Sequence, residues 1–111
     1  LDYVVPYCND RLAFGEPISH RQAVAFMVAD IGIEIESMRM LVYRAAGRID
    51  AGLECRREAY LARTLCSEKA MEIGTNGVQL LGGAGFIKDH PVEIWYRHLR
   101  AVGVMDGNLL L

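Results

Sequence analysis

The sequence has few of the residues that interrupt helices or cross-link a chain. Its 111 residues include three prolines, at positions 6, 17 and 91, and three cysteines, at positions 8, 55 and 66. The odd number and wide spacing of the cysteines argue against a disulfide framework and a metal-binding motif. They are typical of reduced thiols in an intracellular compartment, and we expect three small buried hydrophobic side chains.

Excess charge and long uncharged runs are also absent. The net charge is −2 and the isoelectric point is near 5.9, which gives no reason to expect nucleic acid or an anionic membrane as a partner. No uncharged run is long enough to span a bilayer. The start carries Asp2 and no basic segment, so we expect no signal peptide there. The histidines, His20, His90 and His98, have no metal-ligand or triad spacing, and we expect no metal site.

Helical periodicity is what the chain has in place of these features. Of its residues, 52% are apolar, and they do not alternate as in strands. From about residue 19 to residue 50 they recur every three or four positions, which predicts one long helix. Similar patterns predict helices at residues 1–13, 54–81 and 91–102. The sequence therefore predicts an all-α domain.

Capping residues give the expected ends of these helices. Ser19 is predicted to cap the long helix, with Gln22 completing a capping box. Asp89 is predicted to cap the last helix, with Pro91 in its first turn. The second helix is predicted to end at the glycines of residues 82–83, one of them in a left-handed conformation.

Two helix faces indicate close packing partners. Phe26, Ile33 and Met40 lie off the main apolar stripe of the long helix, so this helix is expected to pack on more than one side, at a neighbouring helix or a subunit interface. The second helix carries a ridge of small residues, which lets another backbone approach: Ala62, Cys66, Ala70, Gly74 and Gly77.

Four segments in one order resemble the C-terminal helical domain of the acyl-CoA dehydrogenase family. Residues 11–18 are similar to an R-x-x-F-G-x-x-I turn, and residues 22–30 to the helix that follows it. Residues 79–86 resemble Q-x-x-G-G-x-G-[FY]. Residues 89–97 resemble D-x-P-x-E-x-x-x-R-D and lead to residues 104–108, which stand where the family has I-Y-E-G-T.

The resemblance implies a single domain over residues 1–111, an antiparallel four-helix-bundle-like fold truncated at both ends. It also implies an FAD-dependent enzyme that introduces an α,β double bond into an acyl-CoA thioester. Implied partners are the acyl-CoA substrate, an electron-transfer flavoprotein or similar acceptor, and further subunits in a homo- or hetero-oligomer. The implied location is a bacterial cytoplasm or a mitochondrial matrix.

The same resemblance assigns candidate cofactor residues. Arg11 corresponds to an arginine that contacts the FAD pyrophosphate across a dimer interface, and Phe14, Arg21 and Gln22 would line the same cofactor. The segment that would touch the adenosine end of a neighbour's FAD comprises Gln79, Leu80, Leu81, Gly82 and Gly83. Without the resemblance, Arg11 is best interpreted as an ordinary surface arginine near a turn, and the glycines as a helix end.

Asp106 stands where most of the family has a catalytic glutamate. Aspartate keeps the charge but is one methylene shorter, which moves the carboxylate by about 1 Å. Either Asp106 is the base, or the base lies elsewhere, or the subunit is catalytically silent; without the resemblance, Asp106 belongs to a turn. Met105 and Gly107 would adjoin the substrate, and Asn108 would reach the flavin or its ribityl chain.

Three alternatives to a working dehydrogenase are open. One is a silent subunit of a hetero-oligomeric dehydrogenase, consistent with the replaced residues around Asp106. The second is an acyl-CoA oxidase of the same superfamily, which passes electrons to oxygen. The third is a stand-alone helical interaction module without a cofactor.

Overall fold

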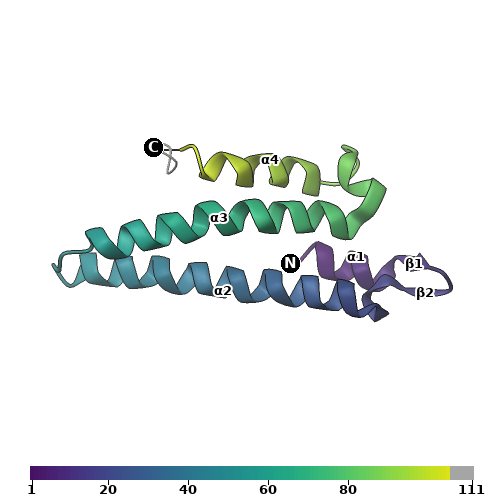
Figure 1. The fold of residues 1–111 in the computed structure, drawn as a ribbon, viewed down its shortest axis with the longest axis horizontal. Coiled ribbons are helices and arrows are strands. Elements are labelled where there is room, and N and C mark those ends of the chain that lie inside the picture. The colour runs from purple at the N-terminus through teal and green to yellow at the C-terminus, as the bar shows by residue number, and fades with distance from the viewer. Residues whose placement is uncertain (106–111) are drawn as a thin grey trace.

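Residues 1–105 are described by a computed structural model as a long helical hairpin with shorter elements at its sides (Figure 1). The elements in order are α1 (Val4–Asp10), β1 (Leu12–Ala13), β2 (Glu16–Pro17), the 3₁₀ turn η1 (Ile18–His20), α2 (Gln22–Asp50), α3 (Arg56–Leu81), the 3₁₀ turn η2 (Gly82–Phe86) and α4 (Val92–Val102). The all-α prediction is confirmed. None of the helices in this range is both long and apolar enough to cross a membrane.

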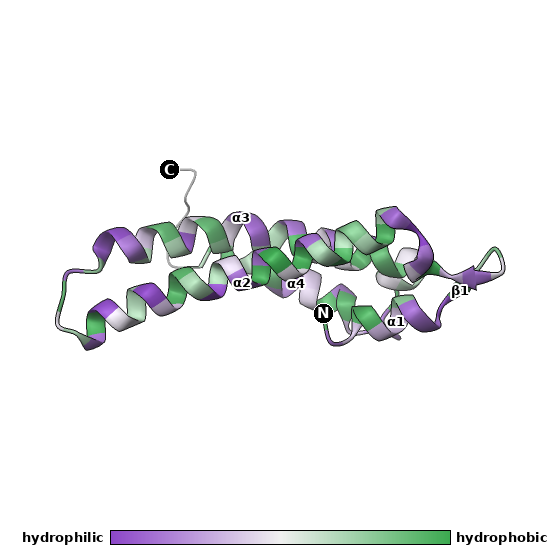
Figure 2. Ribbon diagram, turned by 90° about the horizontal axis from the view of Figure 1, so that it is seen from below, coloured by the Kyte–Doolittle hydropathy of each residue, from purple (hydrophilic) through white to green (hydrophobic). Residues whose placement is uncertain are grey.

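The helix α3 is the centre of the arrangement. It packs against α2 along one side and against α4 along another, and α1 lies beside α2 and α3 near their η1 and η2 ends (Figures 1 and 2). Neighbouring long helices run antiparallel, as expected for short connections. The result is elongated, with extents of 56 × 24 × 20 Å.

The core joins all four helices at the end where α1 lies. Its buried side chains come from α1, α2, α3 and α4 and are Val4, Cys8, Ile31, Leu80, Leu81 and Val92. Farther along, an apolar hollow of about 360 Å³ has walls from the same four helices and from Leu1. The side chains that face one another across the helices are therefore largely apolar, as the colouring in Figure 2 indicates.

The ridge of small residues on α3 has the predicted role. Ala62, Ala70, Gly74 and Gly77 are buried, and Cys66 is half-buried. A Cβ at Gly74 would lie 3.3 Å from the Tyr96 ring, and a Cβ at Gly77 would lie 3.4 Å from Val92. The absence of side chains at these two positions lets α4 lie close against α3.

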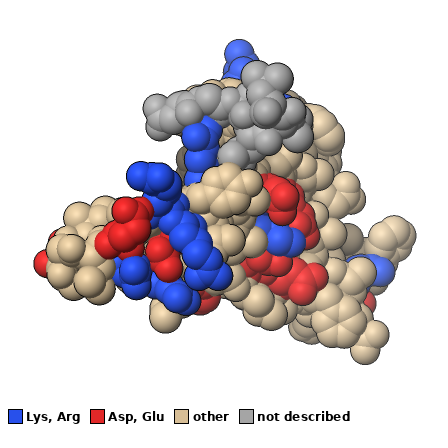
Figure 3. Space-filling model, turned by 60° about the vertical axis from the view of Figure 1, so that its left-hand side comes forward, with Lys and Arg blue, Asp and Glu red and all other residues tan. Residues whose placement is uncertain are grey.

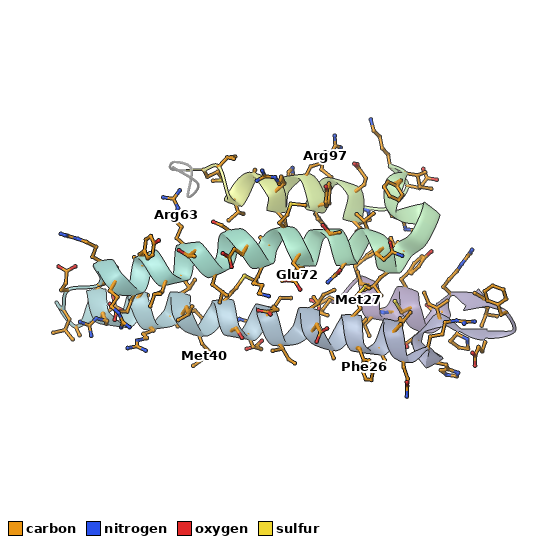
Figure 4. The ribbon with its side chains drawn as sticks, in the orientation of Figure 1. Phe26, Met27, Met40, Arg63, Glu72 and Arg97 are labelled. Carbon is orange, nitrogen blue, oxygen red and sulfur yellow. The ribbon has the colours of Figure 1, made fainter. Side chains whose placement is uncertain are left out.

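The second apolar face of α2 is exposed in the chain as described. The exposed fractions of Phe26, Ile33 and Met40 are 62%, 63% and 66%. Figure 4 shows Phe26 and Met40 pointing away from α3. This face has no partner within residues 1–105, so the expectation that α2 also packs on this second side stays a prediction.

The predicted capping box at Ser19 is wrong. Ser19 lies inside η1, and α2 begins at Gln22 after Arg21, with no side-chain hydrogen bond at the cap. The N–H of Arg21 instead donates to the Ile18 carbonyl at 3.1 Å, which closes a tight 3₁₀ turn. The backbone hydrogen bonds of this turn leave Ser19 too early in the chain to cap α2.

The predicted cap of the last helix is also wrong. Pro91, not Asp89, precedes the first residue of α4, and its carbonyl accepts the N–H of Trp95 at 3.1 Å. The fixed φ of proline suits a helix start, and no side-chain hydrogen bond caps α4.

The first helix is shorter than residues 1–13. It ends at Asp10 because Arg11 has an extended backbone, and a two-residue antiparallel ladder follows, with Leu12 opposite Pro17. The Arg11 carbonyl accepts the N–H of Ile18 at 2.9 Å, closing the turn that carries Phe14. Pairs this short leave no alternating pattern in a sequence.

Candidate functional site

An exposed aromatic ring stands at the tip of the turn between β1 and β2. Phe14 has a positive φ of 56° and its side chain is 95% exposed. The guanidinium carbon of Arg21 lies 5.0 Å from the centre of the Phe14 ring, and Arg21 Nη2 donates to the Ala13 carbonyl at 3.4 Å. A left-handed phenylalanine held in water is costly for folding alone, which indicates a contact surface.

Two further polar candidates flank this turn. Arg11 follows the last residue of α1, is exposed, and has no ion-pair partner within residues 1–105. Gln22, the first residue of α2, is also exposed. A planar guanidinium without a carboxylate partner can bind a diphosphate through two parallel hydrogen bonds. The turn therefore combines an aromatic face, two cations and an amide on one exposed surface.

The end of α3 offers backbone rather than side chains. Leu80 and Leu81 are buried in the core, so only their backbone atoms can reach a ligand. Gly82 has a φ of +60°, which confirms a glycine-dependent helix end, and its N–H donates to the Gln79 carbonyl. Cβ atoms built at Gly82 and Gly83 would meet nothing within 4 Å. These glycines leave open space for another molecule to approach.

Gly85 has a different role. A Cβ there would lie 2.4 Å from the Val78 carbonyl oxygen, so this glycine is required for packing of η2 on α3. Beside it a hollow of about 390 Å³ is lined by residues that include Gln79, Phe86 and Arg97. The exposed amide of Gln79 thus lies at the edge of a concave surface.

The helix α1 brings these two segments to the same end of the molecule (Figure 1). The Tyr7 hydroxyl donates to the Leu81 carbonyl at 3.3 Å, and the Arg11 N–H donates to the Tyr7 carbonyl at 2.9 Å. The two segments expected to contact FAD, the turn and the end of α3, therefore lie at the same end of the molecule and are connected through α1.

Met105, the one described residue among those expected to adjoin the substrate, does not lie at this end. Met105 is exposed, and its carbonyl accepts a hydrogen bond of 2.9 Å from Arg63 on α3. Arg63 and Gln79 are 16 positions apart on this helix, which at about 1.5 Å per residue is roughly 24 Å. Asp106, Gly107 and Asn108 lie outside the described residues.

Charged side chains gather at the other end of the molecule, around the turn from α2 to α3 (Figure 3). The carboxylate of Glu58, 8% exposed, lies 3.3 Å from Arg48 and 3.8 Å from both Arg44 and Arg57. Midway along the helices, hydrogen bonds to Glu72 and Glu34 raise the pKa of Lys69 above its usual value. Of these pairs, those of Glu58 with Arg44 and Arg48 and that of Lys69 with Glu34 join α2 to α3, and all lie away from the candidate site.

Comparison with known proteins gives this surface its context. The family described as "Acyl-CoA dehydrogenase, C-terminal domain" matches residues 1–109. The chain belongs to the acyl-CoA dehydrogenase family. An acyl-CoA dehydrogenase of Bacillus subtilis is 36% identical over 107 residues, which are 96% of this chain and 28% of that protein.

Two further proteins are similar to this chain over nearly its whole length. The caffeyl-CoA reductase-Etf complex subunit CarC of Acetobacterium woodii is 38% identical over 96% of this chain and 28% of its own length. The structure of butyryl-CoA dehydrogenase from Megasphaera elsdenii superimposes with a TM-score of 0.91 at 32% identity, over 95% of this chain and 27% of that one. The chain thus spans about 28% of the length of the Bacillus subtilis and Acetobacterium woodii relatives.

Tyr7 and Arg63 are not among the residues that the sequence patterns indicate. Tyr7 reads as an ordinary amphipathic residue of a short helix, and its partner Leu81 is 74 positions away. Arg63 reads as a solvated residue of α3, and its partner Met105 is 42 positions away. No local pattern reports either contact, because both depend on how the helices pack.

Proposed function

We propose that residues 1–111 form the C-terminal helical domain of a longer FAD-dependent acyl-CoA dehydrogenase. The whole enzyme would remove two hydrogens from an acyl-CoA thioester and produce the trans-2-enoyl thioester. The observation that carries this proposal is the exposed surface made by the Phe14 turn and the Gly82–Gly83 backbone. In a chain of this family, such a surface is best explained by contact with FAD.

The residues present fit the parts of FAD. The unpaired guanidinium of Arg11 matches a diphosphate, and the exposed Phe14 ring offers a flat apolar face. Arg21 and Gln22 add donors beside that ring, and Gln79 with the open glycine backbone suits an adenosine. FAD, when bound, supplies the acceptor for the hydride.

The separation along α3 favours an FAD held mainly by a neighbouring subunit. Met105, which precedes the proposed base, is bonded to Arg63 on α3. Arg63 and Gln79 are separated along this helix by roughly 24 Å. One chain would therefore contribute its turn and glycine segment to one active site and its Asp106 segment to another. This arrangement requires at least a dimer.

Asp106 is the proposed general base, taking the proton from the carbon next to the thioester carbonyl. A carboxylate acts on so weak an acid only when it is positioned closely and kept from bulk water. Met105 and Gly107 would adjoin the acyl chain, and Asn108 would donate a hydrogen bond to the flavin or ribityl chain. The bond from Arg63 to the Met105 carbonyl supports this segment from α3.

The proposed partners follow from the exposed faces and from the relatives. The apolar face of α2 around Ile33 suits contact with another subunit in a homo- or hetero-oligomer. The name of the CarC relative places that protein in a complex with Etf, which supports an electron-transfer flavoprotein or similar acceptor here. We place the enzyme in a bacterial cytoplasm or a mitochondrial matrix.

The deciding experiment uses the full-length protein. The purified protein should carry FAD, seen in its visible spectrum, and an acyl-CoA should bleach the flavin and reduce an acceptor dye. Asp106→Asn should keep FAD and lower the rate of bleaching by at least about a hundredfold. Protein with no flavin and no dye reduction with any acyl-CoA would overturn the proposal.

Three results would redirect the proposal instead. Unchanged bleaching in Asp106→Asn would assign the base to another residue. Bound FAD with no bleaching by any acyl-CoA would identify a silent subunit, and hydrogen peroxide formed during turnover would identify an oxidase.

A further inference from the structure

We infer that Tyr7 is a positioning residue that holds the two FAD-contact segments in one fixed arrangement. The inference rests on the proposed function, since it assigns a role within the proposed cofactor site. Tyr7 itself lies on α1 and is half-buried beneath that surface. Its contribution is to the geometry of the residues that touch the cofactor.

Tyr7 is hydrogen-bonded to both segments at once. Its carbonyl accepts the N–H of Arg11 at 2.9 Å, which fixes the backbone where α1 gives way to the Phe14 turn. Its hydroxyl donates to the carbonyl of Leu81 at 3.3 Å, which fixes the end of α3. A single side chain and its own backbone thus connect the turn to the end of α3, which lies 74 positions from Tyr7 in the sequence.

The ring of Tyr7 is held in place by neighbouring aromatic side chains. The His90 ring lies edge-on at 5.6 Å from the Tyr7 ring. The Tyr3 hydroxyl is 2.6 Å from His90 Nδ1, and the Tyr3 ring packs edge-on against Trp95 at 5.6 Å. Edge-to-face contacts of this kind restrict rotation of the rings. The Tyr7 hydroxyl is therefore already aimed at Leu81 before a ligand arrives.

The carbonyl of Leu81 needs such a partner. The last four carbonyls of a helix accept no hydrogen bond from an N–H of the same helix. Leu81 is the last residue of α3, so its carbonyl is one of these four. The chain then passes through Gly82 at a φ of +60° and Gly83, whose backbones have more freedom than any other residue type. Without the Tyr7 hydroxyl, the segment that would face the adenosine would sample other conformations.

This role predicts a loss of cofactor affinity rather than of chemistry. A cofactor that must meet the Arg11 turn and the Gly82–Gly83 backbone together binds more weakly when either segment is unrestrained, because binding must then order it. These segments would hold the adenosine and diphosphate end of FAD, whereas the hydride goes to its flavin ring, so the rates of hydride and proton transfer should not change once the site is filled.

The test is Tyr7→Phe in the full-length enzyme, with FAD titrated into the apoprotein. The dissociation constant of FAD should rise by about two- to tenfold, the usual effect of one lost hydrogen bond. The kcat at saturating FAD should stay within about twofold of wild type. The melting temperature of the apoprotein measures any general loosening of the fold.

The matched control is Tyr3→Phe. It removes a hydroxyl from the same aromatic cluster, but its partner is His90 and it bonds to neither FAD-contact segment. A positioning role requires a larger rise in the FAD dissociation constant for Tyr7→Phe than for Tyr3→Phe at comparable losses of melting temperature. Equal rises, or no rise for Tyr7→Phe, would overturn the inference while leaving the proposed function standing. A wild-type protein that binds no FAD would overturn both.

Discussion

The guanidinium of Arg63 on α3 donates a hydrogen bond of 2.9 Å to the carbonyl of Met105, 42 residues further along the chain. This bond joins the first third of α3, where Figure 4 labels Arg63, to the segment that follows α4. Met105 directly precedes Asp106. Arg63 can therefore restrain the backbone that leads to the proposed base without touching the substrate.

We expect Arg63→Met to slow proton abstraction while leaving FAD in place. Methionine keeps most of the apolar stem but cannot donate to the Met105 carbonyl, so the segment before Asp106 loses a restraint. A small displacement of a base reduces the rate steeply, and we expect a loss of about three- to thirtyfold in kcat. Single-turnover bleaching of the flavin measures this step directly.

The control for that variant is Arg56→Met, since Arg56 is exposed at the start of α3 and its guanidinium lies 3.9 Å from the Glu54 carboxylate, away from Met105. It should leave kcat unchanged. An equal loss in both variants would show that Arg63 acts through the general charge of the protein.

The two glycines at positions 83 and 85 should respond differently to alanine. Gly83→Ala places its Cβ in open space, so the melting temperature should hold while FAD affinity falls. Gly85→Ala drives a Cβ to 2.4 Å from the Val78 carbonyl, so the protein should lose about 1–3 kcal/mol of stability through forced backbone shifts. Thermal unfolding of the apoprotein and FAD titration separate the two effects. Unchanged FAD affinity in Gly83→Ala would remove that position from the site.

Some of these features could be read from the sequence because they depend on neighbours along the chain. The ridge that includes Gly74 and Gly77 follows from helical spacing, and the second apolar face of α2 follows from the spacing of Phe26, Ile33 and Met40. Motif order also indicated the candidate surface. These predictions use only periodicity and local residue chemistry.

Other features required the packed structure. Serine is a common residue at helix N-caps, but the backbone hydrogen bond from the Arg21 N–H to the Ile18 carbonyl closes a turn around Ser19, and α2 begins after it. The contacts of Tyr7 with Leu81 and of Arg63 with Met105 join residues that the sequence separates by dozens of positions. Propensity and spacing carry no information about which distant helices meet.

Glu58→Gln should destabilise the end of the molecule where α2 turns into α3. The substitution keeps the shape of a buried side chain but removes the charge that offsets Arg44, Arg48 and Arg57. Because these arginines are partly exposed and screened, we expect a loss of about 1–2 kcal/mol, below the usual cost of breaking a fully buried pair.

Chemical denaturation gives this loss, and Glu54→Gln is its control. Glu54 is exposed and lies 3.9 Å from the Arg56 guanidinium, and glutamine can still accept the Arg56 N–H that Glu54 Oε1 accepts at 2.8 Å, so the loss of charge should change stability by less than about 0.5 kcal/mol. A loss no greater for Glu58→Gln than for Glu54→Gln would contradict the structural role of the cluster.

A charge on the outer face of α2 should weaken subunit association. Ile33→Glu places a carboxylate between Phe26 and Met40, and burying it in an interface would require its desolvation. The full-length protein should then sediment at lower mass than wild type. Ile49→Glu is the matched control, an exposed isoleucine on the opposite side of the same helix. Unchanged mass for Ile33→Glu would exclude this face as an interface.

The thiols should react in an order set by burial. Burial raises the pKa of the Cys8 thiol and of the Cys66 thiol above the usual value, so less thiolate is present at pH 8 than in the unfolded chain. Cys8 is also only 1% exposed. Iodoacetamide followed by mass spectrometry should label Cys55 first and Cys8 last, with all three labelled alike in denaturant. Equal labelling of Cys8 and Cys55 in the native protein would contradict this packing.

The spacing of roughly 24 Å along α3 also bears on how defects would combine. If each active site draws its base from one chain and its adenosine contacts from another, damage at Arg11 and damage at Asp106 in a single chain fall on two separate sites. Chains that carry one defect each would then complement one another when mixed, because one site in the hybrid pair would collect both intact halves. The separation along α3 would thus be the reason why two inactive variants restore activity when their chains are mixed.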